Sequence, residues 1–292
     1  AWVTAGASYV AFETELDNPA RDHRLRVLFE TGCDTTTHFA ENAFSVVERH
    51  QRSYDEDSYS IEVPTKVAPA QRFVLLEDGG RGGAVLTDGL PEYELMLDSN
   101  GTIALTLLRC VGQLSQDQLK MRPGGRAGWH NPTPDAQCEG RHIFRYGFFP
   151  YPTPWFEHYD SIERAAVSFI EPLRPRVTKR INPPQHESGL LSLHADGVAL
   201  STIKTACRGN GSGNGNGNGN ENCRENSNGI IIRTYNPTPR PVSGFIEFGP
   251  VPESVKRVRL DERLIEDLVL TDPNKLVDLW QPYEIKTYRV EF

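Results

Sequence analysis

Residues 69–111 form four short runs of apolar or alternating apolar and polar side chains, and turn residues separate these runs. Such alternation is typical of strands that bury one face. Asp78-Gly79, Asp88-Gly89 and Asn100-Gly101 lie between the runs, and these residue types tolerate the positive φ angles that tight hairpins require. The segment therefore predicts an antiparallel meander that leads into a long loop.

Strand-like runs extend over most of the chain. The first set lies at 24–29, 44–48, 59–63, 72–77, 83–87, 92–97, 102–108 and 141–149, and the second at 197–206, 229–238, 242–249, 254–260 and 283–292. Residues 161–173 have the apolar spacing of a helix that ends near Pro172. The Pro- and Arg-rich residues 172–188 predict a crossing between domains. We therefore expect an all-β protein with a large antiparallel sandwich over 1–188 and a small immunoglobulin-like β-sandwich over 189–292.

A tract of Gly, Asn and polar residues occupies 208–228. It has no apolar side chain that could offset the entropy lost on ordering, so we expect a disordered hairpin tip. Cys207 and Cys223 could form a disulfide across this hairpin. The five cysteines show no CxxC pair, which favours reduced thiols and a cytoplasmic location.

The charge and hydropathy of the chain exclude some partners. A net charge of −8 argues against nucleic acid, because such binding depends on clustered Lys and Arg. No apolar run approaches the roughly 20 residues that cross a bilayer, so no membrane partner is expected. The chain starts at Ala1 in strand-like sequence, and we expect it to begin within a longer protein.

The most distinctive local chemistry lies in the loop between the expected strands at 102–108 and 141–149. The loop or its borders carry Arg109, Arg122, Arg126, Trp129 and His130. Arginine forks beside an aromatic plane suit the hydroxyls and apolar face of a sugar. The alternative is that these arginines only pair with surface carboxylates. Both interpretations stay open on sequence.

No complete catalytic or metal-binding set is visible. The histidines form no HxH or HExxH group, so we expect structural or solvent-facing roles for His23, His38, His50, His130, His142, His158, His186 and His194. The acidic residues Asp55, Glu56 and Asp57 predict a loop, since a calcium site would need further oxygen donors.

Several segments together resemble the C-terminal β region of family 38 glycoside hydrolases, the α-mannosidases, and bacterial members most strongly. The segments are 17–32, 44–49, 69–95, 104–115, 133–150, 198–206 and 229–238. The resemblance implies that the large domain is similar to the supersandwich of galactose mutarotases. It also implies a zinc-dependent retaining α-mannosidase whose zinc ligands and catalytic carboxylates lie on a separate N-terminal domain. No catalytic or metal residue therefore maps onto this chain, no cofactor is expected in it, and we expect it to be inactive alone.

The same resemblance implies that a loop of this region carries an Arg toward the active site. Arg122 matches best, with Arg126 and Arg109 as weaker alternatives. The implied partners are the N-terminal catalytic domain of the same polypeptide and a mannose-containing carbohydrate. The substrate is open between a free oligosaccharide, a glycan and a mannosyl-glycerate-like compound, and a homo-oligomer is also open.

Two rival functions remain. A stand-alone carbohydrate-binding β-sandwich would need an exposed aromatic platform, for which the candidates are Trp129, Trp155, Phe156 and Tyr159, although these could equally form a plug between sheet and helix. A mutarotase-like enzyme would need a His acid and a Glu base in one cleft, and His142 is its only candidate.

Overall fold

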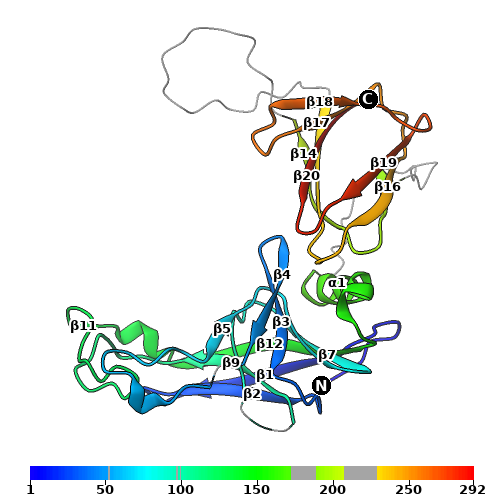
Figure 1. Ribbon diagram of the computed structural model, residues 1–292. Coiled ribbons are helices and arrows are strands. Elements are labelled where there is room, and N and C mark those ends of the chain that lie inside the picture. Colours follow the sequence, from blue (N-terminus) through cyan, green and yellow to red (C-terminus); the bar gives the residue numbers. More distant parts are fainter. Residues whose placement is uncertain (52, 97, 99, 172–188, 207–228) are drawn as a thin grey trace, which may run out of the picture. The chain divides into compact units, whose positions relative to one another are not determined.

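The computed structural model describes residues 1–51, 53–96, 98, 100–171, 189–206 and 229–292. The chain divides into two compact units, Ala1–Leu173 and Arg174–Phe292 (Figure 1). The predicted all-β class is confirmed, since antiparallel strands dominate both units. The predicted tract at 208–228, the Cys207–Cys223 disulfide and the exact boundary between 188 and 189 lie outside the described residues.

Two large antiparallel sheets form the sandwich of the first unit. The larger has the strand order β1-β12-β7-β6-β3-β4, with bounds β1 (Val10–Asn18), β3 (Thr37–Asn42), β4 (Ser45–His50), β6 (Phe73–Asp78), β7 (Arg81–Thr87) and β12 (Gly140–Tyr151). The smaller has the order β2-β9-β8-β5, with bounds β2 (Arg24–Glu30), β5 (Val67–Pro69), β8 (Glu92–Leu95) and β9 (Thr102–Arg109). One core contains buried side chains from both sheets, among them Val74, Val85, Tyr93 and Leu105. Burial of these side chains holds the two sheets together as a sandwich.

The predicted meander at 69–111 is only partly right. Its four strands exist as β6, β7, β8 and β9, but they form two hairpins that belong to opposite sheets. The chain leaves β7 at Thr87 and crosses the sandwich before β8, so Asp88-Gly89 is not a hairpin turn between paired strands. Leu90 lies in this crossing and is buried in the core. Its burial stabilises the passage of the chain from one sheet to the other.

The predicted helix is confirmed as α1 (Tyr159–Ile170). Its buried residues are Tyr159, Ile162, Ala165, Ala166 and Phe169, which lie on one face because they are three or four positions apart. Arg72 also fixes the helix, since its guanidinium donates hydrogen bonds to Glu163 on α1 and to Glu41 on β3. The predicted strand at 59–63 is wrong, because this segment follows the short 3-10 helix η1 (Glu56–Ser58) as irregular chain.

The second unit is a smaller sandwich. One sheet has the order β13-β16-β19, with bounds β13 (Leu191–His194), β16 (Val242–Phe248) and β19 (Lys275–Trp280). The other has the order β14-β15-β20-β17-β18, with bounds β14 (Ala199–Thr205), β15 (Gly229–Tyr235), β17 (Ser254–Val258), β18 (Leu264–Leu268) and β20 (Ile285–Glu291). Their common core includes Ile232, Ile246, Trp280 and Tyr288.

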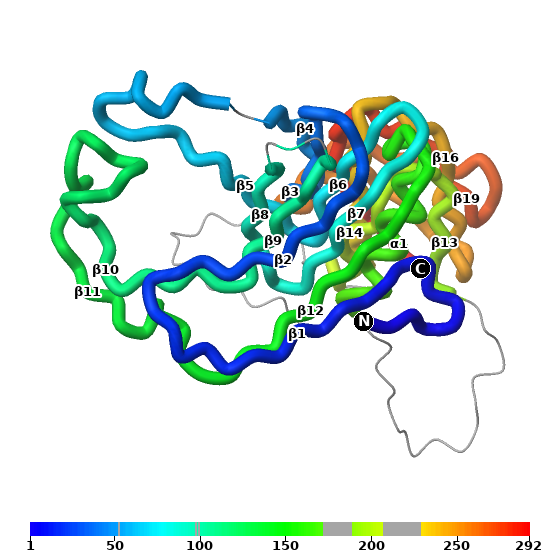
Figure 2. Tube along the Cα trace, turned by 90° about the horizontal axis from the view of Figure 1, so that it is seen from below, coloured from blue at the N-terminus to red at the C-terminus, as the bar shows by residue number. Residues whose placement is uncertain are grey.

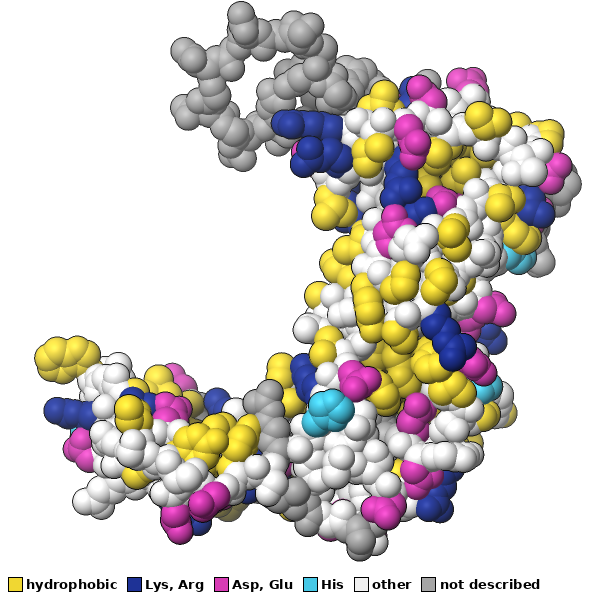
Figure 3. Space-filling view, in the orientation of Figure 1, with side chains coloured by type: hydrophobic (Ala, Val, Ile, Leu, Met, Phe, Trp, Pro, Cys, Tyr) yellow, Lys and Arg dark blue, Asp and Glu magenta, His cyan; other side chains and the backbone are white. Residues whose placement is uncertain are grey.

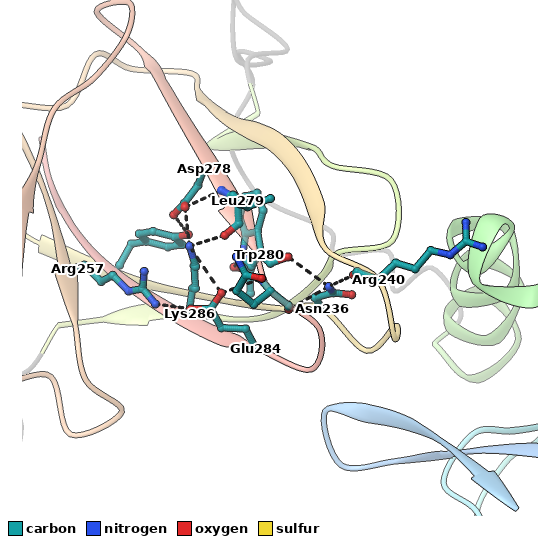
Figure 4. Close-up of polar contacts among 11 residues, drawn as sticks. Asn236, Arg240, Arg257, Asp278, Leu279, Trp280, Glu284 and Lys286 are labelled. Atoms are coloured by element: carbon teal, nitrogen blue, oxygen red, sulfur yellow. Dashed lines mark hydrogen bonds and ion pairs between the residues drawn. The ribbon is translucent and has the colours of Figure 1, made fainter.

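A buried lysine lies beside this second core (Figure 4). The ammonium of Lys286, 4% exposed, contacts the carboxylate of Asp278 and donates a 2.8 Å hydrogen bond to the carbonyl oxygen of Leu279. The Tyr288 hydroxyl donates a 2.7 Å hydrogen bond to Asp278. Burial acts to raise the pKa of Asp278, but the hydrogen bonds from Lys286 and Tyr288 outweigh it and hold this pKa below its usual value. The network gives a buried cation the partners it needs.

Candidate functional site

The predicted loop leaves the first sandwich after β9 and packs against a second loop. Residues 112–133 contain the short antiparallel pair β10 (Gln113–Leu114) and β11 (Asn131–Pro132). Two backbone hydrogen bonds join them to residues 53–65, from the Val63 nitrogen to the Met121 oxygen at 2.8 Å and from the Gly124 nitrogen to the Ile61 oxygen at 3.1 Å. We call residues 53–65 and 112–133 the paired loops. They project from the same end of the unit (Figures 1 and 2).

Arg122 lies where the paired loops meet. One guanidinium nitrogen, Nη1, contacts the carboxylate of Glu62. The side chain is 22% exposed, and its Nε is buried without a hydrogen-bond partner in the described part of the chain. Gly124 allows the backbones of the two loops to lie close together, because a Cβ at this position would lie 2.8 Å from the Ile61 Cα. Arg122 therefore has a defined place and a buried Nε donor that is unused.

The other two predicted arginines face carboxylates other than Glu62. The Nε of Arg126 is 3.6 Å from an Asp117 oxygen, and His130 is 3.5 Å from the other oxygen of Asp117. Arg109, at the end of β9, donates a 3.0 Å hydrogen bond to Glu92 on β8. Each of the three arginines thus faces a carboxylate, as the surface-pairing interpretation expects. The proposed sugar-binding role of these residues stays a prediction.

Apolar side chains are exposed on the paired loops. Trp129 is 88% exposed, and Ile61, Leu114, Leu119 and Met121 are also exposed. Figure 3 shows hydrophobic side chains next to charged ones at the end where these loops lie. Isolated exposed apolar residues are ordinary, but five on two joined loops are typical of an interaction surface.

The other candidate aromatics do not form a platform. Trp155 and Tyr159 are buried, and Trp155 packs against Phe39 and Phe156. The plug interpretation is therefore confirmed for Trp155 and Tyr159. Trp129 is the member of the predicted set that is fully available at the surface.

The structure gives His142 a backbone partner. Its Nε2 donates a 2.7 Å hydrogen bond to the Cys138 oxygen, and its ring stacks on Phe144. No carboxylate contacts the His142 ring among the described residues, so the acid and base pair of a mutarotase is not assembled there. In the same part of the chain no group of three or more His, Cys, Asp or Glu could hold a metal ion. The described residues therefore do not fit a zinc site. Likewise, none of the described helices has the length and apolar character needed to cross a bilayer.

Sequence reasoning missed a polar cleft at the edge of the first sandwich. It has a volume of about 410 Å³ and is lined by residues of β3, β4, β5 and β8, including His38 and Arg49, and by neighbouring residues such as Lys66. His38 lies in polar sequence, and its burial depends on pairing of β3 with β6, which brings together residues far apart in the chain. Local alternation gives no signal for such a cleft.

Two family models match the chain, one in each unit. Residues 2–125 match "Glycosyl hydrolases family 38 C-terminal domain", and residues 197–288 match "Glycosyl hydrolases family 38 C-terminal beta sandwich domain". A curated relative from Halalkalibacterium halodurans, which carries the name "Putative mannosylglycerate hydrolase", is 29% identical over 212 residues, or 70% of this chain.

Two crystal structures from Enterococcus faecalis are similar over 98% of the chain. One is an alpha-mannosidase from strain V583, with a TM-score of 0.72 and 27% identity. The other is a protein in the glycosyl hydrolase family 38, with a TM-score of 0.69 and 26% identity. The chain spans 21% of the length of the curated relative and 28% of each of these two chains.

Proposed function

The chain is the C-terminal β region of a family 38 glycosyl hydrolase, and from this premise we propose that it is the non-catalytic part of a zinc-dependent retaining α-mannosidase. The main support is that two C-terminal family models match in order, one in each unit, while the chain spans 28% of a similar alpha-mannosidase. The zinc ligands and catalytic carboxylates would lie on an N-terminal domain of the same polypeptide. Retention of configuration requires two carboxyl groups there, one as nucleophile and one as acid and base.

We propose that the paired loops are this region's contribution to the active site. Arg122 has a fixed position, and the exposed part of its guanidinium could bind a substrate hydroxyl or a catalytic carboxylate. Arg126 and Arg109 are weaker candidates, because Arg126 pairs with Asp117 and Arg109 lies on the sheet rather than on the paired loops. The exposed apolar side chains around Trp129 would meet the catalytic domain.

The names of the relatives support a substrate class. One carries the name of a mannosylglycerate hydrolase and another is an alpha-mannosidase, so we propose α-mannosides, with mannosylglycerate among them. We also propose a cytoplasmic enzyme, which the free thiols of Cys33, Cys110 and Cys138 support.

The test is hydrolysis by the complete protein, in which this chain follows the upstream residues of its gene. We expect it to release p-nitrophenol from p-nitrophenyl α-mannoside and mannose from mannosylglycerate, to lose both activities with a chelator and to regain them with zinc. Product analysis by NMR should show the α-anomer first. Full activity after complete metal removal, or the β-anomer as first product, would contradict the proposal.

The alternative, a stand-alone carbohydrate-binding module, is favoured only by the exposed ring of Trp129. Its test is glycan binding by this chain that is lost in Trp129→Ala.

A further inference from the structure

The polar cleft lies where the two sheets of the first sandwich end. β4 is one edge strand of the six-stranded sheet and β5 is one edge strand of the four-stranded sheet. Residues of both line the cleft, with His38 of β3 and Leu95 of β8. Its volume of about 410 Å³ falls within the range of small-molecule sites, roughly 300 to 1,000 Å³. The cleft can therefore hold a ligand the size of one sugar ring.

His38 is a buried wall residue with unmet hydrogen-bonding capacity. Its side chain is on the buried strand β3, the residue is 5% exposed, and the ring packs edge-to-face on Tyr93. The Nδ1 atom is buried and has no hydrogen-bond partner among the described residues. Burial, with the charges of Arg49 and His50 adding to it, lowers the pKa of His38 to about 4. A neutral imidazole offers one donor and one acceptor, and buried groups of this kind usually find a partner.

Arg49 is held at the same cleft from a second strand. Its Nη1 donates a 2.9 Å hydrogen bond to the Tyr93 hydroxyl and another to the Pro69 oxygen. These bonds join β4 to β8 and β5, and they fix the guanidinium across the edge of the sandwich. No other hydrogen bond of Arg49 is found in the part of the chain that the structure describes, so its Nε and Nη2 stay available to a ligand.

The remaining lining residues decide the class of ligand. Lys66 adds a second cation, Glu48 adds a carboxylate, and Val67 and Leu95 add apolar surface. Glu48 lies 3.4 Å from His50 and Lys66 donates a hydrogen bond to Glu56, so neither of these charges needs an ion as its partner. The many polar groups disfavour an apolar ligand. Hydroxyl groups both donate and accept, so a polyol can satisfy His38, Arg49 and Glu48 together. We infer that this cleft binds a neutral monosaccharide unit, at a site whose lining includes Thr65 of the paired loops but neither Arg122 nor Trp129.

The test is binding by this chain, measured by isothermal titration calorimetry and by saturation-transfer NMR. The probes are the methyl α-glycosides of mannose, glucose and galactose, with phosphate and acetate as anion probes. We expect a dissociation constant on the order of 1 mM for at least one glycoside. Hydrolysis plays no part in this experiment, so its failure would leave the proposed mannosidase function untouched.

Two variants locate the binding in the cleft. His38→Phe keeps a ring against Tyr93 but removes both nitrogens, and Lys66→Gln removes a cation at the rim; each should weaken glycoside binding by about three- to tenfold. Lys120→Gln is the matched control, because Lys66 and Lys120 both pair with Glu56 but only Lys66 lines the cleft. Melting temperatures check that each variant folds.

Three results would overturn the inference. The first is the absence of saturable binding by all three glycosides, and the second is binding of the anions alone. The third is glycoside binding that does not depend on the cleft: either Lys66→Gln and Lys120→Gln weaken it equally, or only Trp129→Ala weakens it, which would place the sugar at Trp129.

Discussion

The guanidinium of Arg122 and the carboxylate of Glu62 form an ion pair that joins two loops more than fifty positions apart in the chain. Glu62 is largely exposed, whereas the Arg122 side chain is mostly buried. A pair with one partner in solvent adds little stability, typically less than about 1 kcal/mol. The pair therefore matters more for where it places Arg122 than for the strength of the fold.

Arg122→Ala in the complete enzyme should lower kcat/KM for p-nitrophenyl α-mannoside by about 10- to 100-fold, because we propose that Arg122 donates a charge-assisted hydrogen bond in the active site. Arg141→Ala is the matched control, since Arg141 also pairs with a surface carboxylate, that of Glu15, but lies on β12. Equal kcat/KM for the two variants would refute the proposed role of Arg122 in the active site.

Lys286→Ala should destabilise the second unit by about 3 to 5 kcal/mol, because the half-buried Asp278 carboxylate loses its cation. Thermal and urea unfolding of the chain measure the loss. Arg259→Ala breaks the exposed pair with Asp261 and should cost less than about 1 kcal/mol. A similar loss of unfolding free energy in the two variants would show that the buried Lys286 network stabilises this unit no more than an exposed ion pair does.

The stability of the first unit should fall as the pH is lowered from about 7 to 4 because of His38. The pKa of its folded form is about 4 and lies below the ordinary value of 6.5, so the unfolded chain binds the proton first. The contribution is complete above pH 6.5 and is lost as the pH falls to about 4, with a total of about 3 kcal/mol.

His38→Phe should flatten this part of the pH dependence, measured by urea unfolding at several pH values. His194→Gln, in the second unit, should leave it in place. Identical pH profiles for wild type and His38→Phe would refute the assignment of the slope to His38.

Gly82→Ala should destabilise the first unit by about 1 to 3 kcal/mol, because a Cβ at this position would lie 2.4 Å from the Tyr151 ring. Gly80→Ala is the control, since a Cβ there meets no atom within 4 Å. The melting temperature should fall only for Gly82→Ala. A fall of the same size in both would show that glycine is needed for the turn rather than for the contact between β7 and β12.

The sequence predicted local structure well and long-range assembly poorly. Alternation identified β2, β6, β7 and β9, and apolar spacing identified α1, because each pattern depends on near neighbours. It did not show that β7 and β8 belong to different sheets, which depends on burial of the crossing at Leu90.

The candidate site shows the same limit. Arg122 was singled out by its loop and by resemblance, but its partner Glu62 lies in a segment that was expected to be a strand. β3, β13, β18 and β19 were not predicted, and the cleft around His38 depends on β3. These strands and the cleft depend on contacts between strands that are far apart in the sequence, and no short motif predicts such contacts.

The most direct test compares this chain with the complete protein on p-nitrophenyl α-mannoside in the presence of zinc. We predict hydrolysis by the complete protein and none by the chain, because the catalytic carboxylates and the zinc site would lie on the N-terminal domain. Hydrolysis by the chain alone, lost on chelation and at a rate similar to that of the complete protein, would contradict the assignment of this region as a non-catalytic part of an α-mannosidase.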